Sequence, residues 1–392
     1  MQPLRLAMYE PKFLRNLRRR ANQTLARWRP LPARFVYGPQ YQFAWPDTPF
    51  DEVRGERVLT ALAGEGLVLG EHIKQPPLAS YHAILRVHSD AYIESAQTPA
   101  TMGQIVASPV SDRDTQRILD LQRSMVGGTM LATDIALSTG NIAVNLGGGF
   151  HHARAASGRG FCVFNDLAVA IAEQRALGFH GRALVIDLDM HDGDGTRTIF
   201  AADRSVHTLS IHHTNWDDAP AVESTTVALG PDVDDATYLD AVRTHVSVVL
   251  RQFRPHLIYF VSGVDGAADD PVGDWSLSEA ALLARDEAVF EMCRQLAPAA
   301  LELHRQGQGG GGRPGEVGAG TVCTAAHRHR PRLRRQALDA RHQPVRASSG
   351  ARACDGGTAA EIARAARTAA GSPLCSGTAA ACRVAAFRGS VG

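Results

Sequence analysis

The chain has 392 residues, of which 44% are hydrophobic and 21% are charged, and its formal net charge at pH 7 is +1. This composition is typical of a globular protein and excludes collagen-like, membrane-embedded and wholly disordered classes. A net charge near zero gives no overall attraction to nucleic acid, so we expect no direct nucleic-acid binding.

Residues 1–34 are predicted to be a basic N-terminal extension. The stretch KFLRNLRRRANQTLARWRP has apolar residues at Phe13, Leu14, Leu17 and Leu25 among several arginines. Such a pattern is compatible with binding to a membrane surface, with binding to an acidic partner and with a terminal helix that is simply exposed to solvent. We favour the solvent-exposed helix. The extension lacks the apolar segment of a signal peptide, and no run reaches the roughly 18 to 20 residues of a membrane span. We therefore expect a cytoplasmic protein without a membrane span.

Residues 35–296 are predicted to form a single α/β domain with a mostly parallel central sheet flanked by helices. Helical periodicity alternates here with short apolar runs, as expected for strands that helices cover on both faces. The predicted strands are residues 142–146, 183–189, 207–212 and 257–262, and the predicted helices are residues 53–67, 115–138, 165–178, 238–253 and 278–296. Polar motifs follow several of these strands, where an open parallel sheet places its ligand sites.

Residues 297–392 are predicted to be a low-complexity tail rich in Ala, Gly and Arg. Residues 301–392 contain one isoleucine, Ile362, and one aromatic residue, Phe387. Because few large apolar groups offset the entropy of ordering, we expect mostly disorder, with a weak helix near residues 359–370. Our hypothesis is that the tail is read out of its original frame, so that the C-terminal part of the domain is lost.

The first chemical motif is GGGFHH, directly after a predicted strand. Glycines at positions 147–149 let the backbone turn tightly, and His151 and His152 titrate near neutral pH. The residues alone leave a catalytic and a structural role open for each histidine. The following loop, residues 157–162, also suits a plain connection to the next helix.

The second motif is VIDLDMHDGDG. Strand alternation places Asp187, Asp189 and His191 on one face, and such oxygen and imidazole ligands suit a divalent metal such as zinc. The alternative is that these side chains cap loops and helix N-termini. A third strand ends in SGVD, and its Asp265 completes an Asp, His, Asp set that leaves a coordination position open for water.

Three stretches in order, GGGFHHARAASGRGFCVFNDLAVA, VIDLDMHDGDGT and SGVDGAADDPVGDWSLSEAAL, resemble the motifs of the zinc-dependent histone deacetylase family, in the arginase/deacetylase superfamily. The resemblance covers about residues 35 to 296. YGPQYQF and NLGGGFHHA look closest to the class IV type and to bacterial acetoin-utilisation and acetylpolyamine amidohydrolase-like members. This resemblance implies an arginase/deacetylase-like fold and a zinc hydrolase that removes acetyl or acyl groups from lysine side chains or polyamines.

The resemblance also implies the ion sites. Asp189, His191 and Asp265 would hold Zn2+. A structural K+ ion would lie near Asp187, Asp189, His191 and Ser210.

The same resemblance assigns the catalytic and substrate-binding residues. His151 and His152 would act on the attacking water and the leaving amine, and Asp187 and Asp194 would orient these two histidines. The narrow channel for the acyl-amine chain would be lined by Gly149, Gly160 and Phe161.

Two positions depart from the family pattern. The family carries a tyrosine on a glycine-rich turn, whose hydroxyl stabilises the oxyanion. The last tyrosine of this chain is Tyr259, inside a predicted strand, and the corresponding region reads QGQGGGGRPGE. Loss of one such donor costs about a hundred- to thousandfold in rate. Asp192 stands where many relatives have His or Gln, and we assign it only added negative charge near the metal.

Three functions remain open: a zinc amidohydrolase, a catalytically impaired or dead remnant, and an arginase-like enzyme with two manganese ions. The absent tyrosine favours the remnant, whereas the tandem histidines and the single Asp265 favour one zinc over two manganese ions. Rim residues would select the substrate. The loop that contains His212, His213, Trp216 and Asp217 suits either this rim or a solvated turn.

Overall fold

The computed structural model describes residues 12–28, 33–42, 53–270, 273–297 and 320–324. Their strands form an eight-stranded sheet in the order β2-β1-β3-β8-β7-β4-β5-β6, and every strand pair is parallel. The strands are β1 Ala33–Val36, β2 Ile73–Lys74, β3 Ile142–Asn145, β4 Ala183–Asp187, β5 Val206–His212, β6 Ser224–Ala228, β7 Leu257–Val261 and β8 Gly320–Thr324.

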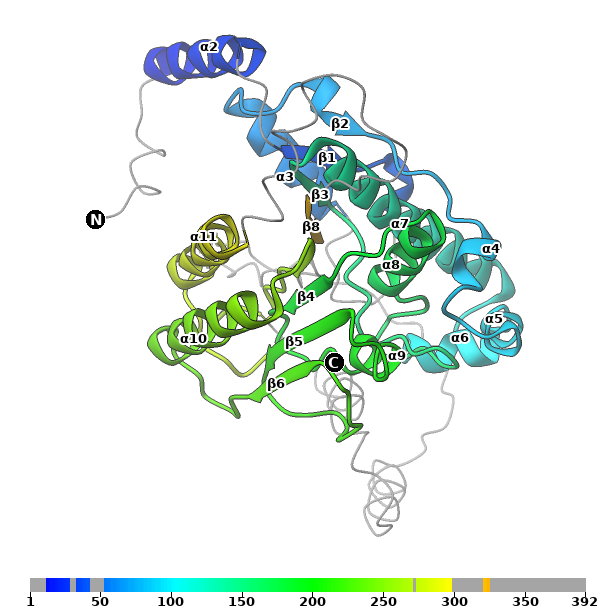
Figure 1. Cartoon of the computed structure of the whole chain (residues 1–392). Helices are drawn as coiled ribbons and strands as arrows, with labels where there is room; N and C mark the ends of the chain where they lie inside the picture. The colour runs from blue at the N-terminus through cyan, green and yellow to red at the C-terminus, as the bar shows by residue number, and fades with distance from the viewer. Residues whose placement is uncertain (1–11, 29–32, 43–52, 271–272, 298–319, 325–392) are drawn as a thin grey trace, which may run out of the picture. The chain divides into compact units, whose positions relative to one another are not determined.

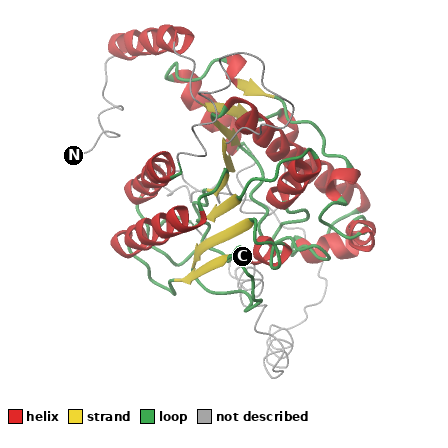
Figure 2. Cartoon of the chain, in the orientation of Figure 1, coloured by secondary structure: helices red, strands yellow, loops and turns green. Residues whose placement is uncertain are grey.

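Helices lie on both faces of this sheet (Figures 1 and 2). The helices of the described residues are α2 Lys12–Trp28, α3 Arg54–Gly64, α4 Tyr81–Ile84, α5 Asp90–Ala96, α6 Pro99–Ile105, α7 Asp112–Thr139, α8 Asp166–Ala176, α9 Asp194–Ile199, α10 Asp235–Phe253 and α11 Glu279–Leu296, with short 3-10 turns at Pro39–Tyr41 and Gly70–His72. Within the described residues, no helix combines the length and the apolarity that crossing a membrane requires.

The two-sided burial of the strands explains their continuous apolar sequence. In β4, Leu184 and Ile186 belong to a core cluster with residues of α10 and α11, whereas Ala183 and Val185 belong to a second cluster with residues of α7 and α8. Successive side chains of a strand point to opposite faces, so a strand between two helix layers needs apolar residues at every position. The predicted α/β class with a parallel sheet is confirmed.

The predicted strands correspond to β3, β4, β5 and β7, and the predicted helices correspond to α3, α7, α8, α10 and α11. Helix α7 begins at Asp112, three residues before the predicted start, because the Ser111 side chain accepts a hydrogen bond from the backbone N–H of Asp114. β1, β2, β6 and the short helices were not predicted from the sequence.

The structure differs from the predicted disordered tail at residues 320–324, which form β8. This strand pairs with β3 on one side and β7 on the other, and Thr321 is opposite both Ile142 and Ile258. A position between two strands provides backbone hydrogen-bond partners on both sides, which composition alone does not reveal. The rest of the tail, including the predicted helix near residues 359–370, lies outside the described residues.

Candidate active site

The carboxyl ends of β4 and β7 bring the three predicted metal ligands together. The two strands are neighbours, with Asp187 opposite Val261, so the loops that follow them leave the sheet at the same edge. Asp189 and His191 follow β4, and Asp265 follows β7. One potential ligand atom from each of these three residues lies within 4.8 Å of the others.

The donor set fits a divalent cation. His191 Nδ1 lies 2.8 Å from Asp265 Oδ2 and 3.1 Å from Asp189 Oδ1. Both carboxylates are buried, and burial followed by the charge of Asp189 raises the pKa of Asp265. Two buried carboxylates that repel each other would be stabilised by a cation between them. Carboxylate oxygen and imidazole nitrogen are ligands that zinc accepts.

The tandem histidines lie beside this set, and each is bonded to its own carboxylate. His151 Nδ1 is 2.7 Å from Asp187 Oδ2, and His152 Nδ1 is 2.9 Å from Asp194 Oδ1. His151 Nε2 lies 3.8 Å from Asp189 Oδ1, so the ring faces the ligand cluster. All four buried side chains were predicted, and the structure brings them together.

The two imidazoles have opposite electrostatic environments. Burial alone would lower the pKa of His151, but the carboxylates of Asp187 and Asp189 raise it to about 9. Burial, followed by the positive charge of His151, lowers the pKa of His152 to about 3. A cation held by Asp189 would offset part of the rise at His151, because it would neutralise one of the two carboxylates.

Asp166 holds the glycine turn that presents the histidines. Its carboxylate accepts hydrogen bonds from the backbone N–H of Phe150 at 2.7 Å and of Gly149 at 3.1 Å, and from Thr129 Oγ1 at 2.6 Å. Gly148 and Gly149 have φ values of 86° and 80°, which favour glycine. The sequence alone does not show which turn Asp166 faces.

Two arginines reach the carboxylate behind His152. Arg154 donates to Asp194 Oδ2 from Nε at 3.0 Å and from Nη2 at 2.8 Å, and Arg159 pairs with the same oxygen. Burial alone would raise the pKa of Asp194, but His152 and the two arginines lower it. The sequence analysis gave neither arginine a role, since both lie in a loop with no periodic pattern.

The negative charge of Asp192 is balanced by a neighbouring arginine, Arg197. It is buried and receives two hydrogen bonds from Arg197, at 2.6 and 2.8 Å. Asp192 Oδ2 also accepts the backbone N–H of Trp216 at 3.0 Å. The added negative charge expected from the sequence is therefore neutralised, and Asp192 instead anchors the loop that contains Trp216.

The loop after β5, for which the sequence leaves a rim and a solvated turn open, has one residue against the histidines and one that is fully buried. The Trp216 ring stacks on His152 with 4.0 Å between centroids and an angle of 4°, and Asp217 pairs with Arg197 at 2.8 Å. His212 is fully buried between Ser210 and Asn215, so it does not line a mouth. Of the four residues considered, only Trp216 contacts a predicted catalytic side chain directly.

Of the predicted channel residues, Gly160 lies against a histidine, and Phe161 packs against a core cluster that includes Ile105. Gly160 has a φ of 57°, and a Cβ at this position would be 2.6 Å from His152 Cδ2. Phe161 also has a positive φ, of 66°, and its backbone N–H donates to Ile105 O at 3.0 Å. A side chain at position 160 would therefore displace His152, which explains why this position is glycine. The spacing of residues in the sequence does not reveal this constraint.

The family tyrosine has no counterpart in Tyr259. This side chain is fully buried in β7, and its hydroxyl is 3.0 Å from Thr133 Oγ1 of α7. It therefore faces a helix and not the ligand cluster. The segment QGQGGGGRPGE lies outside the described residues.

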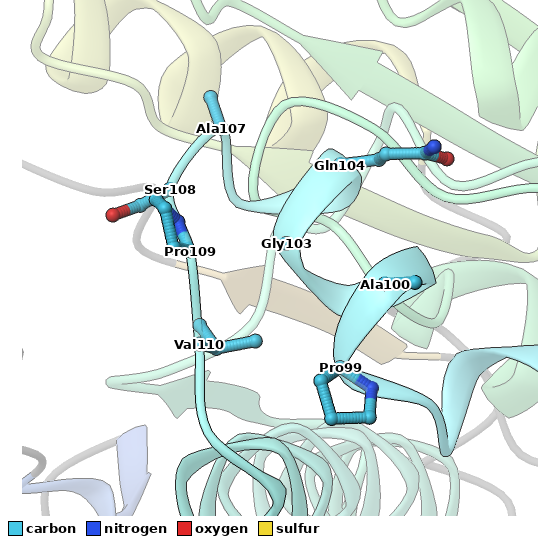
Figure 3. A pocket seen from close by; sticks show the side chains of 8 residues that line it. All are labelled: Pro99, Ala100, Gly103, Gln104, Ala107, Ser108, Pro109 and Val110. Atoms are coloured by element: carbon cyan, nitrogen blue, oxygen red, sulfur yellow. The ribbon is translucent and has the colours of Figure 1, made fainter.

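A shallow hollow lies beside α6 and the loop that follows it (Figure 3). Its lining contains no titratable side chain, so it offers neither acid–base groups nor metal ligands. The lining residues are Pro99, Ala100, Gly103, Gln104, Ala107, Ser108, Pro109 and Val110.

Arg285 is a buried cation behind the metal-ligand cluster, and its loss should destabilise the fold. It donates to Ser262 Oγ at 2.6 Å and to the carbonyl of Gly263, the turn that leads to Asp265. Arg285→Met should lower the free energy of unfolding by about 3 kcal/mol, because it leaves the buried carbonyl without its donor. Urea unfolding would measure this. The control is Arg294→Gln on the same helix, where the side chain is 66% exposed and the change in the free energy of unfolding should be less than about 0.5 kcal/mol. Equal losses of stability in the two variants would contradict the expectation.

His88 should make folding stability pH-dependent. Its Nε2 accepts the backbone N–H of Asn165 at 3.0 Å, so Nδ1 carries the hydrogen that faces Arg154 O at 2.9 Å. Burial lowers the pKa of His88 to about 4. Because the folded chain favours the neutral ring, this stabilisation is complete above about pH 6.5 and is lost as the pH falls toward 4.

Between pH 7.5 and pH 5, the free energy of unfolding of the wild type should therefore fall by about 2 kcal/mol more than that of His88→Gln. Urea unfolding at the two pH values would measure the difference. The exposed His82 provides the matched variant, His82→Gln, which should keep the wild-type pH dependence. Identical pH dependence for all three proteins would contradict the role of His88.

Comparisons with known proteins agree with this geometry. Residues 48–311 match the histone deacetylase domain family. An uncharacterized protein of Picosynechococcus is 33% identical over 264 residues, which cover 66% of this chain and 86% of the relative. Histone deacetylase 2 of Arabidopsis thaliana is 32% identical over 63% of this chain, and the acetoin utilization protein AcuC of Staphylococcus aureus is 31% identical over 59%. The alignments span 66% and 65% of these two relatives.

Solved structures share the fold. The crystal structure of an HDAC homolog from Aquifex aeolicus has a TM-score of 0.59 and 21% identity, and the match covers 75% of this chain and 79% of that chain. An HDAC homolog complexed with SAHA matches with the same TM-score and coverage at 20% identity.

Proposed function

Because the chain belongs to the histone deacetylase family, we propose that it is a zinc-dependent amidohydrolase that removes acetyl or acyl groups from lysine side chains or polyamines. One observation carries the proposal: the cluster of Asp189, His191 and Asp265 lies beside two buried histidines, each bonded to its own carboxylate. Amide hydrolysis needs these two elements, a site for a Lewis acid and groups that exchange protons.

Asp189, His191 and Asp265 would hold the ion. When bound, zinc supplies Lewis acidity that polarises the amide carbonyl and acidifies water. The loops after β4 and β7 fix these three ligands, so binding would need little rearrangement of the chain. In the described part of the chain this cluster has three residues, which supports one zinc ion over the two manganese ions of an arginase-like enzyme.

His151 and His152 would move the protons. The Nδ1 atom of each ring is bonded to a carboxylate, at 2.7 Å for His151 and 2.9 Å for His152, so the opposite nitrogen, Nε2, is left for proton exchange. One imidazole would accept the proton of the attacking water, and the other would donate a proton to the departing nitrogen. Asp187 and Asp194 would hold both rings in the required tautomer.

The substrate chain would approach beside His152. Gly160 lies against one part of this ring and Trp216 stacks on it, so both residues would contact an extended acyl-amine, together with Gly149 and Phe161. The structural K+ ion implied by the sequence remains part of the proposal. Ser210 is the register partner of Asp187 in β5, which supports a shared site.

A second candidate is a protein that binds zinc and an acyl-amine with little turnover. The observation that favours it is Tyr259, whose hydroxyl is bonded to Thr133 in the core instead of facing the metal ligands. A missing oxyanion donor costs about a hundred- to thousandfold in rate. The metal-ligand cluster would be the same in both candidates, so only turnover separates them.

The test is hydrolysis of a fluorogenic acetyl-lysine peptide and of an acetylated polyamine by the zinc-loaded full chain. We expect turnover that a chelator abolishes and added zinc restores, and Asp189→Asn should be inactive. Folded protein that contains zinc but shows no turnover on either substrate would favour the second candidate. Activity that needs two manganese ions would support the arginase-like enzyme instead.

A further inference from the structure

Helix α2 (Lys12–Trp28) is strongly basic. Its sequence, KFLRNLRRRANQTLARW, contains six cations and no acidic residue. Arg18 pairs with Glu65 at 2.6 Å, which offsets one of these charges. The chain as a whole is almost neutral, so α2 is the kind of local basic surface that the net charge conceals.

The apolar residues of α2 form a stripe that faces solvent. Phe13, Leu14, Leu17 and Ala21 fall within about 100° of the helix circumference. The first three side chains are 71%, 46% and 55% exposed, and Ala21 is exposed as well. A surface helix of a globular protein normally buries such a stripe against the core, so this exposed stripe marks an interaction surface.

The helix contacts the α/β domain through its polar side instead. Asn22 Nδ2 donates to the carbonyl of Glu65 at 2.8 Å, and a Cβ at Gly66 would be 2.5 Å from Arg19 O. These contacts lie at the end of α3 and in the turn after it. Because the polar side contacts the domain, the apolar stripe is left outward, with cations along its edges.

We propose that α2 binds an anionic lipid surface, with Phe13, Leu14 and Leu17 inserted at the headgroup boundary and the arginines on lipid phosphates. An exposed apolar stripe on a cationic helix fits a plane of anionic headgroups above hydrocarbon. A second copy of the chain would bring two helices of high positive charge together, which repulsion disfavours. Nucleic acid would match the arginines but would leave the apolar stripe in water.

The experiment is sedimentation of the full chain with phosphatidylcholine vesicles, with and without about one third phosphatidylglycerol. The wild type should bind the anionic vesicles, bind the neutral ones at least tenfold more weakly, and dissociate as salt is raised. Leu14→Glu/Leu17→Glu should lower the partition coefficient more than tenfold. Arg19→Gln/Arg20→Gln should lower it by up to about thirtyfold, because each cation near an anionic surface contributes about fivefold.

Matched variants outside α2 test specificity. Leu177→Glu changes a leucine that is 69% exposed, and Arg204→Gln/Arg251→Gln removes two exposed cations. Both controls should bind like the wild type, and circular dichroism should show that every variant is folded. The proposal is overturned if the wild type ignores anionic vesicles, if neutral vesicles bind equally, or if the α2 variants bind like the controls. Self-association or nucleic-acid binding that depends on α2, without vesicle binding, would also overturn it.

Discussion

Asp265→Asn is expected to weaken zinc binding by more than about a hundredfold and to abolish hydrolysis. Asp265 offers one of the three potential ligand atoms; its Oδ2 lies 2.8 Å from His191 Nδ1, and its Oδ1 accepts the backbone N–H of Met190 at 3.0 Å. The asparagine keeps the shape of the side chain but removes its charge. Because burial and Asp189 already disfavour the ionised form of Asp265, the metal-free variant should be at least as stable as the wild type.

Zinc-dependent unfolding separates metal binding from catalysis. Zinc at a hundred times its dissociation constant should raise the wild-type free energy of unfolding by about 3 kcal/mol, and it should leave Asp265→Asn nearly unchanged. Asp274→Asn is the matched control, since Asp274 follows the same strand but pairs with His213. An Asp265→Asn protein that zinc stabilises as much as it does the control would show that the ion binds elsewhere.

His152→Ala is expected to keep its zinc and to lower kcat by about a hundred- to ten-thousandfold. The ring lies beside the ligand cluster but is not part of it, so metal content should not change. Asp194 would still be neutralised by Arg154 and Arg159 after the ring is removed, so the variant should fold. Zinc content and kcat for the acetyl-lysine peptide are the measurements.

His213→Ala is the control for this variant, because His213 contacts Asp274 and Thr214 rather than Asp187 or Asp194. It should retain most of the wild-type kcat. If His152→Ala also retained most of it, the proton-transfer role of His152 would be wrong. A His152→Ala protein that loses both zinc and activity would instead indicate a role of His152 in metal binding.

The sequence predicts β3, β4, β5 and β7, but it predicts neither the edge strands β2 and β6 nor the interior strands β1 and β8. β3, β4 and β7 have near-continuous apolar sequences, whereas β5 is buried along its whole length but has polar residues between its apolar ones. β6, Ser224–Ala228, is half exposed and pairs with a strand on one side only. Its sequence is therefore mostly polar and lacks the apolar run by which a buried strand is recognised. β2 has two residues and is too short to show a period.

The candidate site also contains residues that the sequence places correctly and supporting contacts that it does not reveal. Asp187, Asp189 and His191 are close in sequence, at the end of β4 and in the turn that follows it, and the parallel pairing of β4 with β7 brings in Asp265. The supporting contacts, such as Asp166 under the glycine turn and Arg285 behind Gly263, join residues far apart in the chain. Only the packing of α8 and α11 reveals them.

The most direct test of the proposed function is a zinc titration of the metal-free full chain, with acetyl-lysine hydrolysis followed at each addition. We expect activity to rise to a plateau at one zinc ion per chain, while Asp265→Asn stays at background. A folded wild type that takes up one zinc ion and remains inactive would contradict the proposal, and so would a plateau that needs a second ion.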